Sequence, residues 1–153
     1  MIFAGIGDTP YNIILILHIL TAMAAFSPAF VHPVLSAQMK ADGMADRPKV
    51  FGYMATNAQT IYGSALIVSG LLGFGVAGMS DDFYKMSQGW LAAAFIIWVG
   101  MNGLLHAVIR PSEKAIAAGE GGDADEKKLA IAGITMTLLL VVQVYLMVWK
   151  PGL

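Results

Sequence analysis

Residues 11–35 read YNIILILHILTAMAAFSPAFVHPVL, and this stretch decides the fold of the chain. It contains no Lys, Arg, Asp or Glu, and a helix of this length, at about 1.5 Å per residue, crosses a hydrocarbon core of ~30 Å with some tilt. The stretch also carries His18, His32 and Pro28, which lipid tolerates only where they face protein, a cavity or a cofactor. We therefore expect the other apolar stretches to form walls around this first helix.

The composition indicates an integral membrane protein. Of 153 residues, 58% are hydrophobic and 12% are charged, against about 25% charged in a typical soluble domain. The net charge of −1 provides no basic field for nucleic acid, so we expect no nucleic-acid partner. Cysteine is absent, which excludes disulfides, thiolate catalysis, iron–sulfur ligation and Cys-based zinc sites.

Hydropathy predicts an all-α fold, a bundle of four transmembrane helices in a single domain, residues 1–153. The expected spans are about 11–39, 51–79, 90–110 and 129–149. Asp8 is expected to cap the first helix, and Pro28 to kink it. We expect Arg110 and Pro111 to close the third span. The polar residues 112–128 are expected to form a mobile solvent loop, with Asp123 to Glu126 starting the last helix.

The positive residues predict the orientation. Two go to one side of the bundle, Lys85 and Lys150, and the other seven to the opposite side. Those seven lie in the 40–49 and 110–128 segments: Lys40, Arg47, Lys49, Arg110, Lys114, Lys127 and Lys128. The positive-inside rule then places both loops in the cytoplasm and both termini outside, in a multi-pass protein of the cytoplasmic (inner) membrane. An aromatic belt is expected at the outer interface, from Tyr11, Tyr84, Trp90 and Trp149.

Small residues recur every four positions in the second span. They are Ala65, Ser69, Gly73 and Ala77, which share one helix face. That spacing lets another backbone approach closely in lipid, so we predict a helix-packing face. The alternative is that glycine is simply commoner in membrane helices.

Counting the rise from each helix end predicts two polar layers inside the bundle. The outer layer holds His18 and Gln143. The inner layer, toward the cytoplasm, holds His32, His106, Asn57, Gln59 and Asn102.

The histidines are candidate ligands for a haem. His18 and His32 are 14 residues apart, which at about 100° per residue is four turns less about 40°, so both leave the helix on a similar side. The spacing resembles that by which helices of b-type cytochromes hold two stacked haems, but only His106 remains as a partner, which excludes two bis-histidine haems. One haem held by His32 and His106, or one held by His18 with a Met or with no second protein ligand, remains open.

Each histidine also has a simpler interpretation. His32 precedes Pro33 near a membrane boundary and can be a solvated interfacial residue, and His106 can sit at the end of its helix. His18 is flanked by Leu and Ile and lies too deep for free hydration. Methionines in the spans, together with His18 and His106, leave Cu(I) as an alternative, although no M-x-x-M cluster occurs within a span.

Signals for catalysis are weak. Apart from the histidines, no acid or base is expected within the membrane. Nucleophile–base pairs, Gly-rich phosphate loops and H-E-x-x-H are absent. Whether the protein is an enzyme stays open at this stage.

The pattern LHILTAMAAF at residues 17–26, followed by a proline and a basic loop, resembles a first-helix signature of small four-helix bacterial membrane proteins, the DUF2269 type. The CopD copper-resistance domain and HemJ-type protoporphyrinogen oxidase are more distantly similar. GWLAAAFIIW at residues 89–98 resembles the start of their third helix. The resemblance implies that His18 is the first-helix histidine linked to haem binding in the HemJ group. Phe26 stands near the position of a tryptophan usual there, and Lys49 is expected in a loop rather than in the second helix.

Three functional hypotheses follow. The first is a small membrane protein that binds a redox cofactor, haem b, for electron transfer or porphyrin chemistry. The second is a non-catalytic accessory subunit that packs against a larger membrane complex or against its own copies. The third is copper transport.

Overall fold

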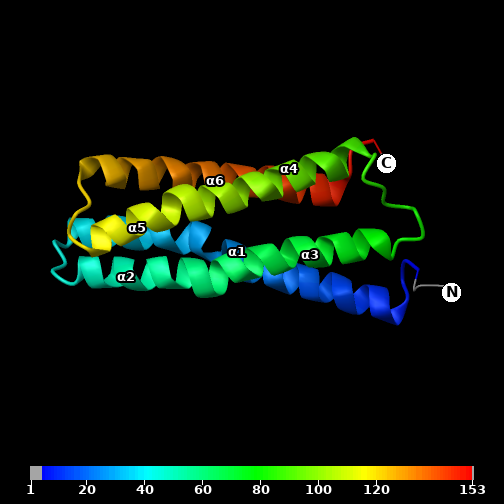
Figure 1. The fold of residues 1–153 in the computed structure, drawn as a ribbon, viewed down its shortest axis with the longest axis horizontal. Coiled ribbons are helices and arrows are strands. Elements are labelled where there is room, and N and C mark those ends of the chain that lie inside the picture. The colour runs from blue at the N-terminus through cyan, green and yellow to red at the C-terminus, as the bar shows by residue number, and fades with distance from the viewer. Residues whose placement is uncertain (1–4, 153) are drawn as a thin grey trace.

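The computed structural model describes residues 5–152, which form a bundle of four long helices without a β-strand (Figure 1). The first helix is α1, Thr9–Ala41. The second joins α2 (Arg47–Asn57), the π-helical turn η1 (Ala58–Gly63) and α3 (Ser64–Gly78). The third joins α4 (Gly89–Leu104), the π-helical turn η2 (Leu105–Ile109) and α5 (Arg110–Ala117), and the fourth is α6, Asp123–Trp149. Each of the four is long and apolar enough to cross a membrane, which confirms the predicted fold class.

The two ends of the bundle differ (Figure 1). Both chain termini lie at one end, and the two loops that carry most of the Lys and Arg residues lie at the other. We call these the terminal end and the loop end. Along the bundle, α1 packs against α3, α4 against α6, and α2 against α5.

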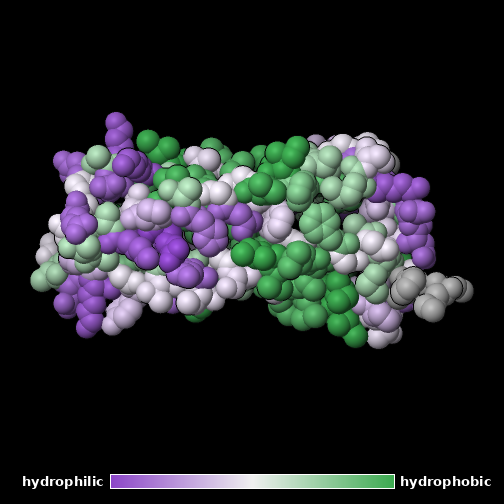
Figure 2. Space-filling model, in the orientation of Figure 1, coloured by the Kyte–Doolittle hydropathy of each residue, from purple (hydrophilic) through white to green (hydrophobic). Residues whose placement is uncertain are grey.

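The helices are longer than the apolar stretches that predict them. Residues 47–78 form 32 residues of helix, about 48 Å at 1.5 Å per residue, against a hydrocarbon core of ~30 Å. The excess lies at the loop end, where Figure 2 shows hydrophilic surface over α2 and α5, while the hydrophobic surface is concentrated toward the terminal end. The bundle therefore continues beyond the hydrocarbon as a short polar helical extension.

The prediction that residues 112–128 form a solvent loop is wrong for its first part, whereas the predicted start of the last helix at Asp123 is confirmed. The third helix continues through Pro111 to Ala117, and α6 already begins at Asp123. The π-helical turn η2 ends just before Pro111, which therefore falls in the first turn of α5, where a missing N–H is tolerated. Only residues 118–122 connect the two helices.

α1 runs through Pro28 and Pro33 without a break. Because Pro28 has no N–H, it cannot bond the carbonyl of Ala24, and the Ser27 hydroxyl donates to that oxygen instead, at 3.0 Å. The expected side-chain cap by Asp8 is not formed: Asp8 occupies the N-cap position, but its carboxylate accepts from the backbone N–H of Gly5. Pro10 lies in the first turn of α1, where a missing N–H is tolerated.

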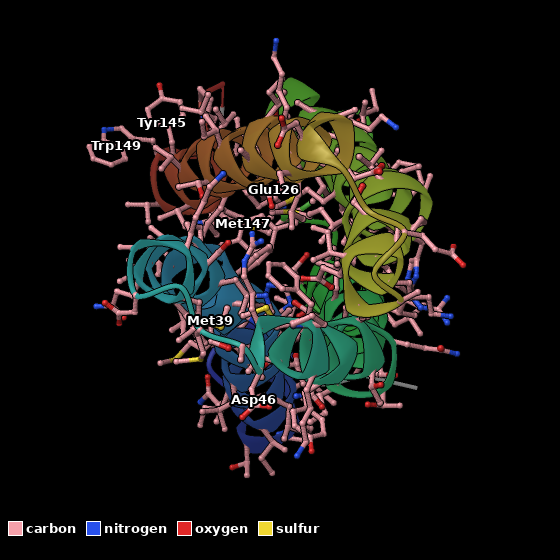
Figure 3. The ribbon with its side chains drawn as sticks, turned by 90° about the vertical axis from the view of Figure 1, so that its left-hand side faces the viewer. Met39, Asp46, Glu126, Tyr145, Met147 and Trp149 are labelled. Atoms are coloured by element: carbon pink, nitrogen blue, oxygen red, sulfur yellow. The ribbon has the colours of Figure 1, made fainter. Side chains whose placement is uncertain are left out.

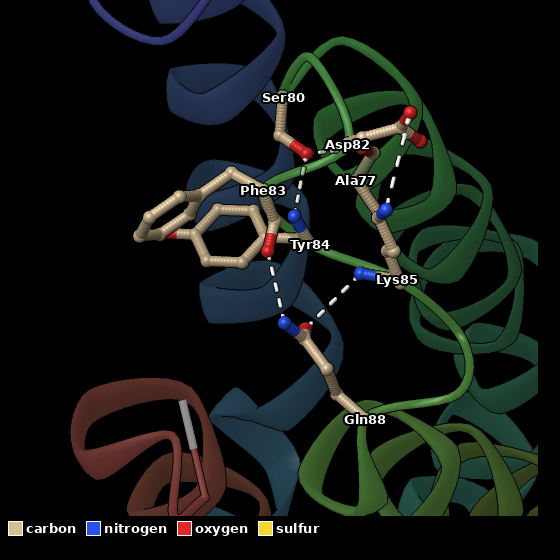
Figure 4. Close-up of polar contacts among 7 residues, drawn as sticks. All are labelled: Ala77, Ser80, Asp82, Phe83, Tyr84, Lys85 and Gln88. Carbon is tan, nitrogen blue, oxygen red and sulfur yellow. Dashed lines mark hydrogen bonds and ion pairs between the residues drawn. The ribbon is translucent and has the colours of Figure 1, made fainter.

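The loop at the terminal end is held by side-chain hydrogen bonds (Figure 4). The Ser80 hydroxyl donates to the carbonyl of Ala77 at 2.6 Å and accepts from the N–H of Tyr84 at 2.8 Å. Gln88 accepts from the N–H of Lys85 and donates to the carbonyl of Phe83. These contacts fix Tyr84 at the mouth of the bundle.

Aromatic residues at the same end include two that project outward from α6 (Figure 3). Tyr145 and Trp149 point away from the bundle and stack with ring centroids 5.4 Å apart. Amphipathic rings of this kind are typical of the membrane interface.

Candidate functional site

Two cavities divide the interior of the bundle. The outer cavity, about 960 Å³, lies toward the terminal end, and the inner cavity, about 650 Å³, lies toward the loop end. Phe26, Phe30 and Leu66 line both, so this layer of side chains separates them. Both volumes fall in the range of cofactor and small-molecule sites, about 300–1,000 Å³.

His18 lines the outer cavity and is fastened to α3. Its Nδ1 atom lies 2.7 Å from the carbonyl oxygen of Ser69, and the Ser69 hydroxyl lies 3.5 Å from the same nitrogen. A carbonyl oxygen only accepts, so Nδ1 carries the proton and Nε2 of the neutral ring keeps a free lone pair. A backbone partner on one ring nitrogen is the usual way in which a histidine is oriented to ligate through the other.

The ring of His18 rests on the small-residue face of α3. A Cβ built on Gly73 would lie 3.1 Å from Cε1 of His18, so only glycine leaves the ring its full space. Ser69 is buried, and Ala77 lines the same cavity. The predicted packing face thus includes positions that contact α1 next to His18.

Polar groups without partners also line the outer cavity. The indole Nε1 of Trp90 and the amide Oε1 of Gln143 are buried and have no hydrogen-bond partner among the described residues. Lys150 lines the cavity too, with Nζ 5.8 Å from the ring centroid of Tyr84. The cavity therefore offers one imidazole lone pair, an apolar wall, an unused N–H donor and a cation.

Methionines contribute soft donors around His18. The outer cavity is lined by Met23, Met86, Met101 and Met147. Residues 5–152 contain no group of three or more His, Asp or Glu side chains that could hold a metal ion. Copper therefore has no assembled set of histidine and carboxylate ligands in this part of the chain.

The inner cavity contains a buried carboxylate that sequence reasoning missed. Glu113 on α5 is 1% exposed, and its Oε1 lies 3.3 Å from Nδ1 of His32 on α1. Its other oxygen, Oε2, is buried and has no hydrogen-bond partner in the part of the chain that the structure describes. His32 also contacts Tyr62 edge to face, with centroids 5.7 Å apart. His32 is thus half-buried against named partners. Glu113 lies beyond Ile109, in the polar extension of the bundle, so the expectation of no acid within the membrane stays a prediction.

A sequence signal for Glu113 did exist. Leu105, Ile109 and Ile116 continue the helical spacing of apolar residues past Pro111, and Ser112 and Glu113 fall on the same buried face. The arginine and proline concealed this pattern because they are typical of a helix end.

A second charged group closes the loop end of the inner cavity. Glu126 on α6 accepts from Lys40 at 2.8 Å and from Arg47 at 2.7 Å, and so joins the ends of three helices. Figure 3 shows Glu126 from this end of the bundle. The hydrogen bonds from Arg47 and then Lys40 lower the pKa of the Glu126 carboxyl. Glu126 lies before Leu129, where the apolar span begins.

His106 lies elsewhere, on the outer surface where the two π-helical turns meet. It is exposed, lines neither cavity, and packs against Gly63 of η1. One turn away, Arg110 donates to the side-chain oxygen of Gln59. The structure therefore does not bring His32 and His106 into one cavity.

Three other residues predicted as polar lining face neither cavity: Asn57, Gln59 and Asn102. Asn57 is half-buried in α2. Asn102 donates to the carbonyl of Trp98 at 2.9 Å, and its Oδ1 is buried with no partner within residues 5–152. Of the amide side chains predicted to line the interior, only Gln143 lines a cavity.

Comparison of the chain with family models, with curated proteins and with solved structures finds no match. Fold and geometry alone define the class: a four-helix membrane bundle with two interior cavities. The resemblance of residues 17–26 to the DUF2269-type proteins stays a prediction.

Proposed function

We propose that this is a haem b protein of the cytoplasmic membrane, with the porphyrin in the outer cavity and His18 as its iron ligand. The observation that carries the proposal is the hydrogen bond from His18 Nδ1 to the carbonyl of Ser69, which leaves Nε2 as the free lone pair of a residue lining an apolar cavity of about 960 Å³. A haem bound there would supply one-electron transfer.

Two further groups support a porphyrin over other apolar ligands. A haem carries two carboxylates that need donors or cations, and the outer cavity provides the unpartnered Nε1–H of Trp90 and the ammonium of Lys150. The apolar wall suits the macrocycle, and the methionines around the cavity are candidate second ligands. Electron transfer or porphyrin chemistry is therefore the proposed role.

The test is haem content in purified protein. Wild-type protein supplied with haem is expected to show a Soret band and a b-type pyridine haemochrome spectrum, and His18→Ala to lose both. His106→Ala is the matched control, because His106 lines neither cavity and its loss should leave the spectrum intact. Wild-type protein that stays colourless with haem, or His18→Ala that keeps the full band, would overturn the proposal.

A second candidate is a subunit of a larger assembly, either a complex or a set of identical copies. One observation favours it: the exposed imidazole of His106 lies beside the Gln59–Arg110 pair on the outer surface, near the edge of the hydrocarbon. Native mass spectrometry from a mild detergent tests this candidate. His106→Trp should weaken the binding of any partner that is present in a fixed stoichiometry. A protein that is monomeric throughout would contradict this candidate.

A further inference from the structure

The unpartnered oxygen of Glu113 points to a second ligand site at the loop end. Glu126 has both oxygens occupied by Lys40 and Arg47, but among the described residues Glu113 has a polar partner for only one oxygen, namely His32. Leaving a buried carboxylate oxygen without a donor costs free energy, so the inner cavity has a strong unused acceptor. This site is separate from the outer cavity and does not depend on the haem proposal.

The charges of the cavity favour a neutral ligand. Apart from His32, the charged residue types that line it balance: Lys40 and Arg47 are basic, and Glu113 and Glu126 are acidic. A carboxylate only accepts, so the nitrogen of His32 that faces Glu113 carries a proton. The site therefore recognises a ligand that donates a hydrogen bond without carrying a net charge.

The side chains that line the inner cavity indicate the chemistry of the remainder of the ligand. Aromatic side chains line this cavity, among them Phe26, Phe30, Phe51 and Tyr62, and most of its other lining residues are apolar. Glu113 lies one turn beyond Ile109, where the apolar part of the third helix gives way to the polar extension. A molecule with an aromatic head at this depth and an apolar tail in the bilayer would fit both.

We propose that the inner cavity binds a lipid-soluble phenol or hydroquinone, whose hydroxyl group donates to Oε2 of Glu113. The ligand's ring packs among the aromatic side chains, and its tail follows the apolar wall toward Phe26 and Phe30. The recognition rests on the donated hydrogen, so a ligand of the same shape without that hydrogen binds more weakly.

The experiment compares 4-decylphenol with its methyl ether, 4-decylanisole, by titration calorimetry into full-length protein in nanodiscs, with empty nanodiscs subtracted. A hydrogen bond to a charged group predicts that wild type prefers the phenol by about tenfold or more. Glu113→Gln should reduce the preference to about threefold or less, because the charged acceptor is gone. Glu120→Gln removes an exposed loop carboxylate and should keep the full preference.

A cavity-filling variant keeps the test decisive if Glu113→Gln fails to fold. Gly133 lines the inner cavity, and a Cβ built there meets no atom within 4 Å, so Gly133→Leu fills open space. It should lower the affinity for both probes at least tenfold. Gly103→Leu adds the same side chain at an equally open position that lines neither cavity, and should change nothing.

Several outcomes would overturn the proposal. They are equal binding of phenol and ether by wild type, full preference in Glu113→Gln, or unchanged affinity in Gly133→Leu. A decyl-hydroquinone arm separates the two ligand classes: tighter binding than the phenol supports a hydroquinone, and equal binding supports a simple phenol.

Discussion

The imidazole of His18 is held to the backbone of Ser69, four helical positions before a glycine that gives the ring its space. Nδ1 lies 2.7 Å from the Ser69 carbonyl oxygen, and Gly73 lies one turn further along α3. Because the acceptor is the backbone carbonyl of Ser69, the hydrogen bond does not depend on the Ser69 side chain. It depends instead on the small residues of α3 that leave space for the His18 ring. The geometry makes Gly73 the sensitive position.

Gly73→Ala is therefore expected to tilt the His18 ring and to lower haem content severalfold, because the new Cβ would lie 3.1 Å from Cε1 of the ring. Haem per protein, from the pyridine haemochrome spectrum, is the measurement. Gly78→Ala on the same helix meets no atom within 4 Å and serves as the control, and Ser69→Ala keeps the backbone acceptor. Full haem content in Gly73→Ala would show that the ring position does not matter.

Gly70→Ala is expected to destabilise the bundle by about 1–3 kcal/mol. A Cβ at Gly70 would overlap the Trp98 indole, whose Nε1 donates to the carbonyl of Leu66 at 2.8 Å. The ring must move, and the hydrogen bond must lengthen or break. Thermal unfolding in detergent, followed by circular dichroism, should show a lowered Tm, with Gly78→Ala close to wild type. An unchanged Tm would mean that Trp98 has another low-energy position.

The four helices follow from the sequence because hydropathy reports directly on the apolar core of a bilayer. The orientation that the placement of Lys and Arg indicates stays a prediction. The helix lengths do not follow from hydropathy, because the residues of the extension at the loop end are polar and give no hydropathy signal. Arg110 and Pro111 resemble a helix end, yet the π-helical turn before them lets the helix continue. No residue pattern in this segment predicts a π-helical turn.

For the candidate sites, too, the sequence predicted one part and not the other. Rise per residue predicted His18 and Gln143 at one level, and both line the outer cavity. The same counting grouped His32 with His106, but depth says nothing of the direction in which each helix face points, and His106 lies outside both cavities. The true neighbour of His32 is Glu113, which lay in a segment interpreted as a loop.

Acid should loosen the loop end through Glu126. Its pKa is lowered from the ordinary value of 4.5 by the hydrogen bonds from Arg47 and Lys40, so the ionised form is the one that the folded state stabilises. This stabilisation is present in full above the ordinary pKa and is lost as the pH falls through the lower, folded-state pKa.

The Tm of wild type and of Glu126→Gln should therefore differ at pH 7 and converge as the pH falls below 4.5. The expected difference at pH 7 is a few degrees, since partly exposed pairs contribute about 1 kcal/mol or less. Glu120→Gln, which removes an exposed carboxylate, should follow wild type at every pH. A constant difference across the titration would rule out the ion pairs as its cause.

Ser27 and Pro28 should be energetically coupled, because the hydroxyl of one replaces the backbone donor that the other lacks. Ser27→Ala alone leaves the Ala24 carbonyl unpaired in lipid and should cost about 0.5–1.5 kcal/mol. In a Pro28→Ala background the new N–H at position 28 bonds that carbonyl, so Ser27→Ala should cost almost nothing. Unfolding of the four variants in detergent mixtures measures the coupling. Thr135→Ala is the control, since the Thr135 hydroxyl donates to the carbonyl of Ile131, which the backbone N–H of position 135 already serves in the α-helix. An equal cost of Ser27→Ala in both backgrounds would show that the carbonyl of Ala24 does not need the hydroxyl.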